Sequence, residues 1–205
     1  MTEKGPSQTA MRVAMRRAAH YLLDAEPKIL ADPFARALAG FSSDEEFLKA
    51  HQALPNPWLR TLFALRHGLA EDELAKAVEH GTRQYVILGA GLDSFAYRQP
   101  DLMRSLDVYE VDHPTSQAWK RERVAALGIT VPPTLHYAPI DFERDTLTEG
   151  LTRAGLNRSE ATFFTWLGVT QYLTRDAVLS TLQEVAAFST AGSTLVLEFI
   201  APPTR

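Results

Sequence analysis

The second half of the chain alternates short apolar runs with helical segments. From residue 84 onward the apolar runs are QYVILG, DVYEVD, TLHYAPI, TFFTWLG and STLVLEFI. Helical segments such as TSQAWKRERVAAL and TRDAVLSTLQEVAAFS separate them. Strands joined by single helices form crossover units, and such units build a parallel sheet. Because both faces of a parallel sheet are covered, its strands read as continuous apolar runs. The pattern predicts an α/β fold with a Rossmann-like, doubly wound, mostly parallel sheet of five strands.

The first part of the chain predicts helices only. Apolar residues follow helical spacing over residues 8–25, where Ser7 or Thr9 can cap the start. A Ser-x-x-Glu capping signature begins a further helix at Ser43. Residues 56–81 carry one helix, or two that are separated near Gly68. We therefore expect a helical cap over residues 1–81 and a sheet over residues 82–205, together in one compact unit.

Composition limits the kinds of partner. The chain has no cysteine, which excludes disulfides, thiolate metal sites and cysteine nucleophiles and fits a reducing cytoplasm. A net charge of -4 disfavours nucleic acid, and the basic cluster Arg12, Arg16 and Arg17 is interpreted as a solvated helix face. No apolar run is long enough to cross a bilayer or to act as a signal peptide. The histidines lack the spacing of metal ligands. We expect a cytoplasmic protein that binds no metal, membrane or nucleic acid.

Three strand ends carry a candidate binding site. Doubly wound sheets bind ligands outside the carboxyl ends of their strands. Gly89-Ala90-Gly91 follows the first strand and permits a tight turn with close approach of a ligand. Asp112 ends the second strand, where a carboxylate can accept hydrogen bonds from a ribose, and Asp141 ends the third, where it can meet an adenine edge. Each feature also has a purely structural interpretation, as a turn or a helix cap. Together they indicate a nucleoside-containing cofactor.

Asp93 bears on which cofactor this is. Ser94 can replace the third glycine of the dinucleotide fingerprint, so NAD stays open. Asp93, however, lies where a pyrophosphate would sit, and its negative charge repels phosphate and attracts a cation. S-adenosylmethionine carries an ammonium and a sulfonium and no phosphate. The turn therefore favours S-adenosylmethionine over NAD.

Several stretches resemble a known family. VILGAGLDSFAYR, YEVDHPTSQAWKRERV, APIDFE and FFTWLGVTQYLT are similar to the leucine carboxyl methyltransferase-like family of S-adenosylmethionine-dependent methyltransferases. The N-terminal stretches PSQTAMRVAMRRAAHYLLD and DPFARALAG resemble its bacterial polyketide O-methyltransferase group, and the similarity runs from about residue 6 to residue 200.

The resemblance implies roles for individual residues. It places the methionine portion of the cofactor on the turn that begins at Gly89, the ribose on Asp112, the adenine between Asp141 and Phe142, and the cofactor carboxylate on Arg66. His113 is expected to frame the ribose pocket or to cap a helix. The cofactor-binding set predicted in this way is Arg66, Gly89, Ala90, Gly91, Asp93, Asp112, His113, Asp141 and Phe142.

The chain departs from the family in two places. Eukaryotic members carry a Glu five positions before a Tyr that matches Tyr172, and here that position is Leu167. Family members also continue past the fifth strand with further helices and an antiparallel pair of strands, so we expect a C-terminally shortened chain. An edge strand left open in this way favours a homodimer.

The expected activity is methyl transfer from S-adenosylmethionine to a carboxylate or hydroxyl of a small metabolite. His20 and Tyr21 are candidates for a general base, and Arg17 for orienting an acidic substrate. Two alternatives stay open. One is a truncated, non-catalytic S-adenosylmethionine-binding protein of the same fold, and the other is an NAD-dependent oxidoreductase.

Overall fold

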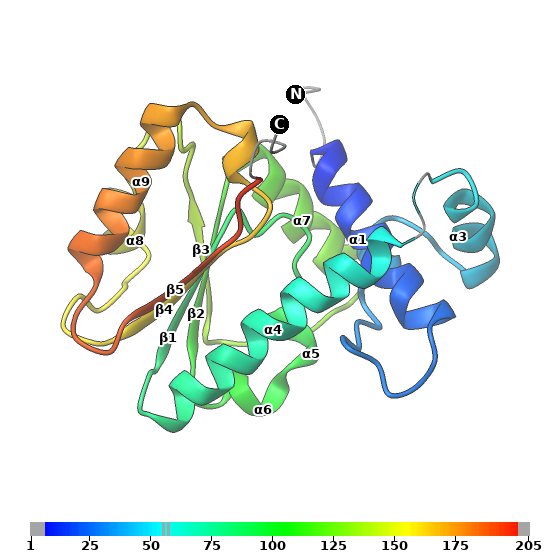
Figure 1. Ribbon diagram of the computed structural model, residues 1–205, viewed down its shortest axis with the longest axis horizontal. Helices are drawn as coiled ribbons and strands as arrows, with labels where there is room; N and C mark the ends of the chain where they lie inside the picture. Colours follow the sequence, from blue (N-terminus) through cyan, green and yellow to red (C-terminus); the bar gives the residue numbers. More distant parts are fainter. Residues whose placement is uncertain (1–6, 55, 57, 201–205) are drawn as a thin grey trace, which may run out of the picture. The chain divides into compact units, whose positions relative to one another are not determined.

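A single five-stranded parallel sheet organises the second half of the chain. The computed structural model describes residues 7–54, 56 and 58–200. The strands are β1 (Gln84–Leu88), β2 (Asp107–Asp112), β3 (Leu135–Pro139), β4 (Thr162–Trp166) and β5 (Thr194–Leu197), in the order β3-β2-β1-β4-β5 (Figure 1). The strand order reverses beside β1, which pairs with β2 on one side and β4 on the other. The predicted fold class is confirmed.

Short elements connect the strands. They are α5 (Phe95–Arg98), α6 (Pro100–Met103), α7 (Pro114–Ala126), α8 (Leu147–Arg153), the 3-10 turn η1 (Thr170–Tyr172) and α9 (Arg175–Phe188). Thr146 and Thr174 cap α8 and α9, since each hydroxyl accepts a hydrogen bond from the backbone N–H three residues on. These crossovers bring the carboxyl ends of all five strands to one edge of the sheet.

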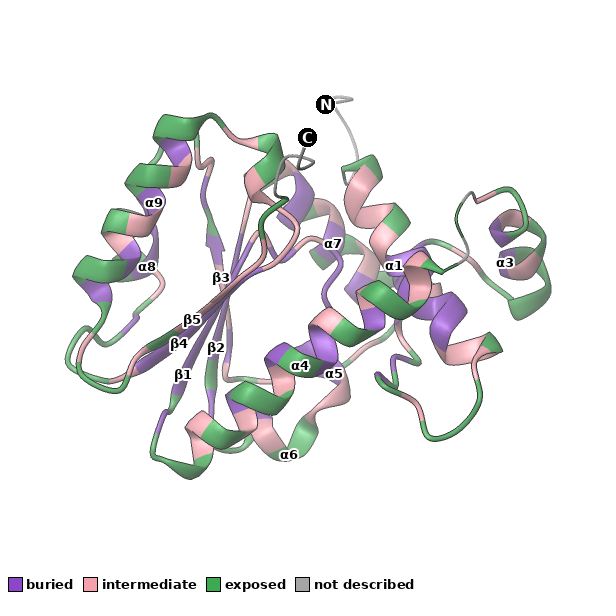
Figure 2. Cartoon of the chain, viewed as in Figure 1, coloured by how far each residue is buried: buried purple, intermediate pink, exposed green. Residues whose placement is uncertain are grey.

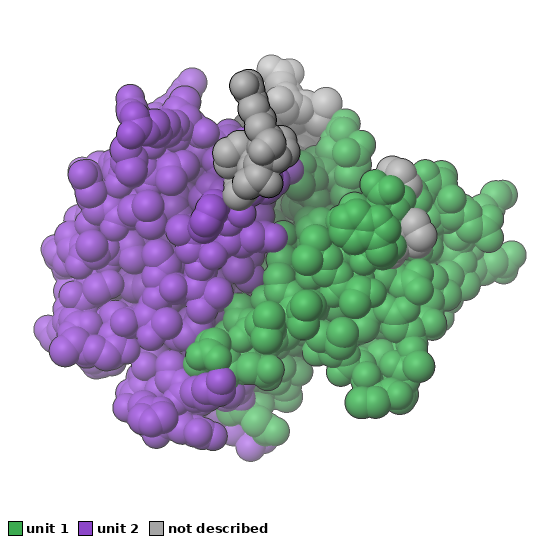
Figure 3. Space-filling view, in the orientation of Figure 1, with its two compact units in different colours: residues 1–73, 91–101, 115–132 green, residues 74–90, 102–114, 133–205 purple. Residues whose placement is uncertain are grey.

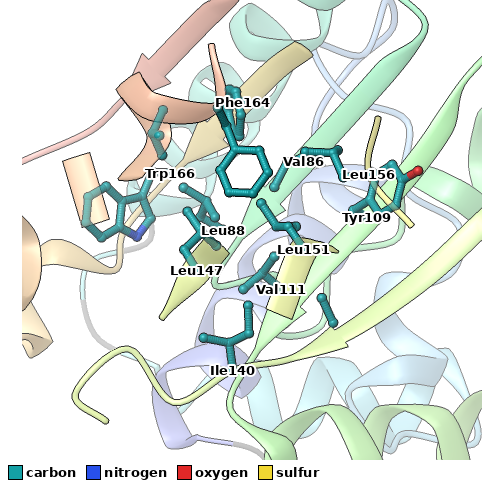
Figure 4. Close-up of a cluster of buried hydrophobic side chains, with 13 residues drawn as sticks. Val86, Leu88, Tyr109, Val111, Ile140, Leu147, Leu151, Leu156, Phe164 and Trp166 are labelled. Atoms are coloured by element: carbon teal, nitrogen blue, oxygen red, sulfur yellow. The ribbon is translucent and has the colours of Figure 1, made fainter. Parts of the chain in front are cut away.

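One face of the sheet packs against α8 and α9 to form an apolar core (Figure 4). Alternate residues of the inner strands point to this face, as the period of two in a strand requires. The core residues are Val86, Leu88, Tyr109, Val111, Ala138, Ile140, Phe164 and Trp166 from the sheet side, with Leu147, Leu151, Leu156, Val185 and Phe188. Gly150 lets α8 approach closely, because a Cβ there would lie 2.2 Å from Ile140 Cδ1.

The first part of the chain is helical, as predicted. Its helices are α1 (Gln8–Leu23), α2 (Ala35–Leu38), α3 (Asp44–His51) and α4 (Leu59–Glu79). Ser7 caps α1 and Ser43 caps α3, each accepting from a backbone N–H three residues on. Residues 59–79 form one helix, which passes through Gly68 without a break. A Cβ at Gly68 would lie 3.0 Å from the carbonyl oxygen of Ile29, so the glycine serves close packing rather than a turn.

The interpretation of the basic cluster on α1 was wrong for two of its three residues. Arg12 is exposed, but Arg16 and Arg17 are only 4% and 3% exposed. Every residue of α1 from position 14 to position 20 is buried, so the helix is covered on all sides over these two turns. Helical periodicity predicts one buried face from the apolar residues, so it misses arginines that are buried on the other sides.

The chain divides into two compact units whose segments alternate along the sequence (Figure 3). The first unit contains residues 1–73, 91–101 and 115–132, and the second contains residues 74–90, 102–114 and 133–205. The sheet lies entirely in the second unit. The sequence predicted a single boundary, after residue 81, between a helical cap and the sheet. In the structure the first unit also includes residues 91–101, which follow β1, and residues 115–132, which follow β2.

Candidate functional site

The turn after β1 is held over the end of β2. The N–H groups of Gly89 and Ala90 both donate to the carbonyl oxygen of Val111, at 2.8 and 2.9 Å. Gly89 has a φ of +71°, which favours glycine, and a Cβ there would lie 2.3 Å from Cγ2 of Val169. The sequence predicted that a ligand approaches the backbone closely at this turn. In the structure Val169, from the segment after β4, lies in close contact with Gly89.

The ends of β2 and β3 bring four predicted residues together in the second unit. Asp112 Oδ1 accepts a hydrogen bond from the His113 N–H at 2.6 Å, and His113 Nε2 lies 3.7 Å from Asp141 Oδ2. The Phe142 ring lies 6.0 Å from that of Trp166. The side chains of His113 and Asp141 keep 30% and 25% of their surface exposed. Two carboxylates, a histidine and an aromatic ring therefore share this edge, and both carboxylates remain within reach of solvent or a ligand.

Asp141 also stabilises its own loop. Its Oδ1 accepts from the N–H of Glu143 at 3.1 Å, and its N–H donates to Asp145 at 2.9 Å. This is the local turn that an aspartate favours at such a position. The capping and binding interpretations of Asp141 are thus compatible, because Oδ2 faces His113 while Oδ1 serves the loop.

Asp93 is buried in the first unit rather than lying open. Its Oδ1 accepts from the Phe95 N–H at 2.7 Å, and its Oδ2 lies 3.9 Å from His67 Nε2. Burial alone would raise the pKa of Asp93, but the positive charges of Arg17 and Arg98 outweigh it and hold that pKa at about 2. The carboxylate is therefore ionised, and cations already surround it.

Arg17 fastens the same turn to α1. Its Nε donates to Asp32 Oδ2 at 2.8 Å, and its Nη2 donates to the Leu92 carbonyl oxygen at 2.6 Å. Ser94 Oγ donates to the same Asp32 oxygen at 2.7 Å, while Asp32 Oδ1 accepts from the Ala35 N–H. One buried ion pair thus joins α1, the start of α2 and the turn after β1. We name Arg17 and Asp32 the turn brace. Sequence reasoning missed this role for both residues.

His67 is a neutral member of this cluster. Its Nδ1 donates to the Phe63 carbonyl oxygen at 2.7 Å, which leaves Nε2 as an acceptor, 3.5 Å from Arg17 Nη1. Burial lowers the pKa of His67 to about 3, and the charges of Arg17 and Arg66 act in the same direction. The imidazole is therefore uncharged at neutral pH and contributes a lone pair beside the turn brace.

A second buried ion pair lies at the end of the turn. Arg98 makes a two-pronged contact with Glu71 of α4, in which Nη1 donates to Oε2 at 2.7 Å and Nη2 contacts Oε1. Gln99 donates to the same carboxylate at 3.0 Å. The sequence offered no local signal for this pair, because its members are 27 positions apart.

The catalytic candidates have structural partners. His20 Nδ1 lies 2.6 Å from Asp24 Oδ2, and His20 Nε2 accepts from the Leu30 N–H at 3.3 Å, so both ring nitrogens are in use. Tyr21 is half-buried on α1. Arg66 is half-buried on α4, with its guanidinium carbon 4.5 Å from the centre of the Phe63 ring. The catalytic and cofactor-binding roles of these residues stay predictions.

The predicted cofactor set falls in both compact units. The second unit supplies Gly89, Ala90, Asp112, His113, Asp141 and Phe142, and the first supplies Arg66, Gly91 and Asp93. Leu167, which stands where the family has an acid, is half-buried directly after β4. Gln171, four residues further on, is exposed and donates to the Gly168 carbonyl oxygen at 3.1 Å.

The strand order and the polar rim at the strand ends define a doubly wound protein of the kind that binds nucleoside-containing ligands. Residues 10–186 match the leucine carboxyl methyltransferase family. The chain belongs to that family, as its resemblance predicted.

Individual relatives agree with this assignment. YktD of Bacillus subtilis (strain 168), named as an S-adenosyl-L-methionine-dependent methyltransferase, is 40% identical over 148 residues, covering 72% of this chain and 46% of YktD. A Mycobacterium avium (strain 104) protein of the same description is 30% identical over 205 residues, covering 94% of this chain and 66% of that protein. The chain thus spans about half to two thirds of the length of these relatives.

A solved structure supports the fold. The crystal structure of a Thermobifida fusca protein, described as a methyltransferase, matches with a TM-score of 0.57 at 20% identity, covering 96% of this chain and 66% of that one. Among the residues that the structure describes, no helix is both long and apolar enough to span a membrane.

Proposed function

We propose that this chain binds S-adenosylmethionine at the carboxyl edge of its sheet and transfers the methyl group to an oxygen of a small metabolite. The observation that carries the proposal is the rim formed by successive strand ends, where Asp112, His113 and Asp141 lie together. Carboxylates there suit a ribose diol and an adenine amine. Family membership supports the same cofactor.

The surroundings of the turn also favour S-adenosylmethionine over NAD. Asp93 is ionised, but the positive charges of Arg17 and Arg98 offset it, so the case against a pyrophosphate rests on the backbone of the turn. The N–H groups of Gly89 and Ala90 already donate to the carbonyl oxygen of Val111. The turn therefore has fewer hydrogen-bond donors for a phosphate.

The acceptor we favour is a carboxylate. Methyl transfer is a direct displacement, in which an acceptor oxygen forms a bond to the methyl carbon as the carbon–sulfur bond breaks and leaves S-adenosylhomocysteine. A hydroxyl acceptor must also lose a proton to a base, whereas a carboxylate has none to lose. The ring nitrogens of His20 are both engaged, so the proposed base is poorly placed to take a proton. A small acid, including an acid of polyketide type, fits these constraints. A cytoplasmic setting without nucleic acid is part of the same proposal.

Calorimetry tests the cofactor. The chain should bind S-adenosylmethionine and its demethylated product, but not NAD. Asp112→Ala should weaken S-adenosylmethionine binding by roughly 1–3 kcal/mol, as expected for a lost buried hydrogen-bond partner. Asp107→Ala, at the other end of β2, is the matched control and should leave the affinity unchanged. Binding of NAD alone would refute the proposal.

A labelled methyl group tests the acceptor. Small acids and small phenols or alcohols are offered together with S-adenosylmethionine carrying a radioactive methyl group. Methyl esters release labelled methanol in alkali, whereas methyl ethers do not. Volatile label would support a carboxylate acceptor, and an alkali-stable product would exclude it. Binding without transfer to any acceptor would favour the non-catalytic alternative.

A further inference from the structure

Helix α4 buries one face within the first unit and exposes large apolar side chains on the opposite face. One face buries Ala64, His67 and Ala70. The opposite face exposes four large apolar side chains: Trp58 at 63%, Leu62 at 42%, Leu65 at 42% and Leu69 at 55%. Figure 2 shows the exposed stretches along α4. A surface helix normally presents charged or polar residues to solvent, so a row of four large apolar side chains marks a candidate contact surface.

The exposed residues form one continuous stripe. Their separations are four, three and four residues, the spacing of the two apolar positions in a coiled-coil repeat. Trp58 directly precedes α4 and follows its path, since its carbonyl oxygen accepts from the Leu62 N–H at 3.5 Å. Ile29, itself 45% exposed, widens the stripe by packing against the backbone of Gly68. We name Trp58, Leu62, Leu65 and Leu69 the α4 stripe.

We propose that the α4 stripe is the interface between two copies of this chain, with the two α4 helices antiparallel. In that arrangement Trp58 lies opposite Leu69 of the second copy, and Leu62 lies opposite Leu65. Every member of the stripe then meets another member, as a two-fold interface requires.

Charge selects the antiparallel direction. The next two positions of the same repeat are Asp72 and Lys76, and a parallel pair would place each beside its own copy. The first turn of α4 contains Arg60, which is paired with Asp24, and no acidic residue of its own. The antiparallel pair brings Asp72 and Glu73 of the second copy toward this turn.

The size of the stripe sets the expected strength. It is about 16 Å long, from the eleven steps between Trp58 and Leu69 at about 1.5 Å each. This is a small contact beside the roughly 800 Å² per partner of a standard interface. We expect a dimer that dissociates in the micromolar range.

Sedimentation velocity over a concentration series tests the association. The unaltered chain should shift toward twice its mass as the concentration rises. Leu65→Arg should remain monomeric at every concentration. Leu179→Arg is the matched control, because Leu179 is an exposed leucine at 44% on α9, and it should associate as the unaltered chain does. Circular dichroism checks that both variants fold.

Cysteine pairing tests the direction, since the chain has no cysteine of its own. A mixture of Trp58→Cys and Leu69→Cys chains should form a disulfide-linked dimer under mild oxidation, whereas neither chain alone should. Linkage of Trp58→Cys chains with each other would refute the antiparallel arrangement. An unaltered chain that stays monomeric throughout, or a dimer that Leu179→Arg disrupts as strongly as Leu65→Arg, would overturn the proposal.

Discussion

Replacing Gly89 with alanine should destabilise the protein by two separable effects. The first is conformational, because a φ of +71° costs a residue with a Cβ roughly 1–2 kcal/mol. The second is steric, because the new Cβ would lie 2.3 Å from Cγ2 and 3.2 Å from Cγ1 of Val169. Valine is stiff at χ1 and cannot easily turn away. Overpacking of this kind typically costs about 1–3 kcal/mol, so we expect Gly89→Ala to cost about 2–5 kcal/mol in all.

Two further variants separate these effects. Gly128 has a similar φ of +65°, but a Cβ there meets nothing within 4 Å, so Gly128→Ala should show the conformational cost alone. In Gly89→Ala with Val169→Ala both valine methyls are gone, and the nearest remaining atom, Cβ, lies at 3.3 Å. The double variant should therefore recover the steric part of the loss and keep the conformational part.

Urea denaturation followed by circular dichroism measures these free energies of unfolding. The reasoning predicts a negative coupling between positions 89 and 169 in a double-mutant cycle. If Gly89→Ala costs no more than Gly128→Ala, or if removing the valine methyls restores nothing, Val169 does not press on the turn as described.

Three other perturbations test the surroundings of the turn and the core. The folded-state pKa of His67 is about 3, below its usual 6.5, so the unfolded chain binds more protons between these values. The free energy of unfolding should therefore fall as the pH drops from about 6.5 to 3, by up to about 1.4 kcal/mol per pH unit. In urea titrations at several pH values, His67→Gln should make this dependence on pH weaker. Arg17→Met should leave Asp32 as an uncompensated buried charge and lower the free energy of unfolding by roughly 3–5 kcal/mol. Adding Asp32→Leu removes both charges, and the double variant should lose less stability than the sum of the two single variants. Additive losses in thermal unfolding would contradict a direct pair. Gly150→Ala should raise helix propensity by about 1 kcal/mol yet still lower the melting temperature, because its Cβ would lie 2.2 Å from Cδ1 and 2.4 Å from Cγ1 of Ile140. Ile140→Ala, which leaves only Cβ at 3.9 Å, should remove that steric penalty.

The sheet was predictable because its signal is local. Each strand is a run of apolar residues closed by glycine or a polar residue, and DVYEVD matches β2 from Asp107 to Asp112. Helix caps were readable for the same reason, since Ser7 and Ser43 act on backbone groups three residues away. The rim at Asp112 and Asp141 followed from topology, because parallel strands end at one edge.

The surroundings of Asp93 were not predictable from the sequence. The charges around its carboxylate come from α1, α5 and α7, and no periodic pattern connects these segments. Arg17 was assigned to solvent or substrate because nothing near it in sequence indicates that it reaches Leu92. Glu71 and Arg98 each resemble ordinary surface charges until the fold places them together.

The turn brace also has a consequence for synthesis on the ribosome. Arg17 leaves the ribosome 75 residues before Leu92, the carbonyl that its guanidinium will hold. At roughly 5–20 residues per second this is a delay of about 4–15 s. During that time Arg17 can pair with Asp32, 15 residues on, but the Leu92 carbonyl that completes its contacts does not yet exist. We therefore expect the nascent N-terminal helices to depend on chaperones, or on slow translation of the following segment, more than their cap signals and apolar spacing would suggest.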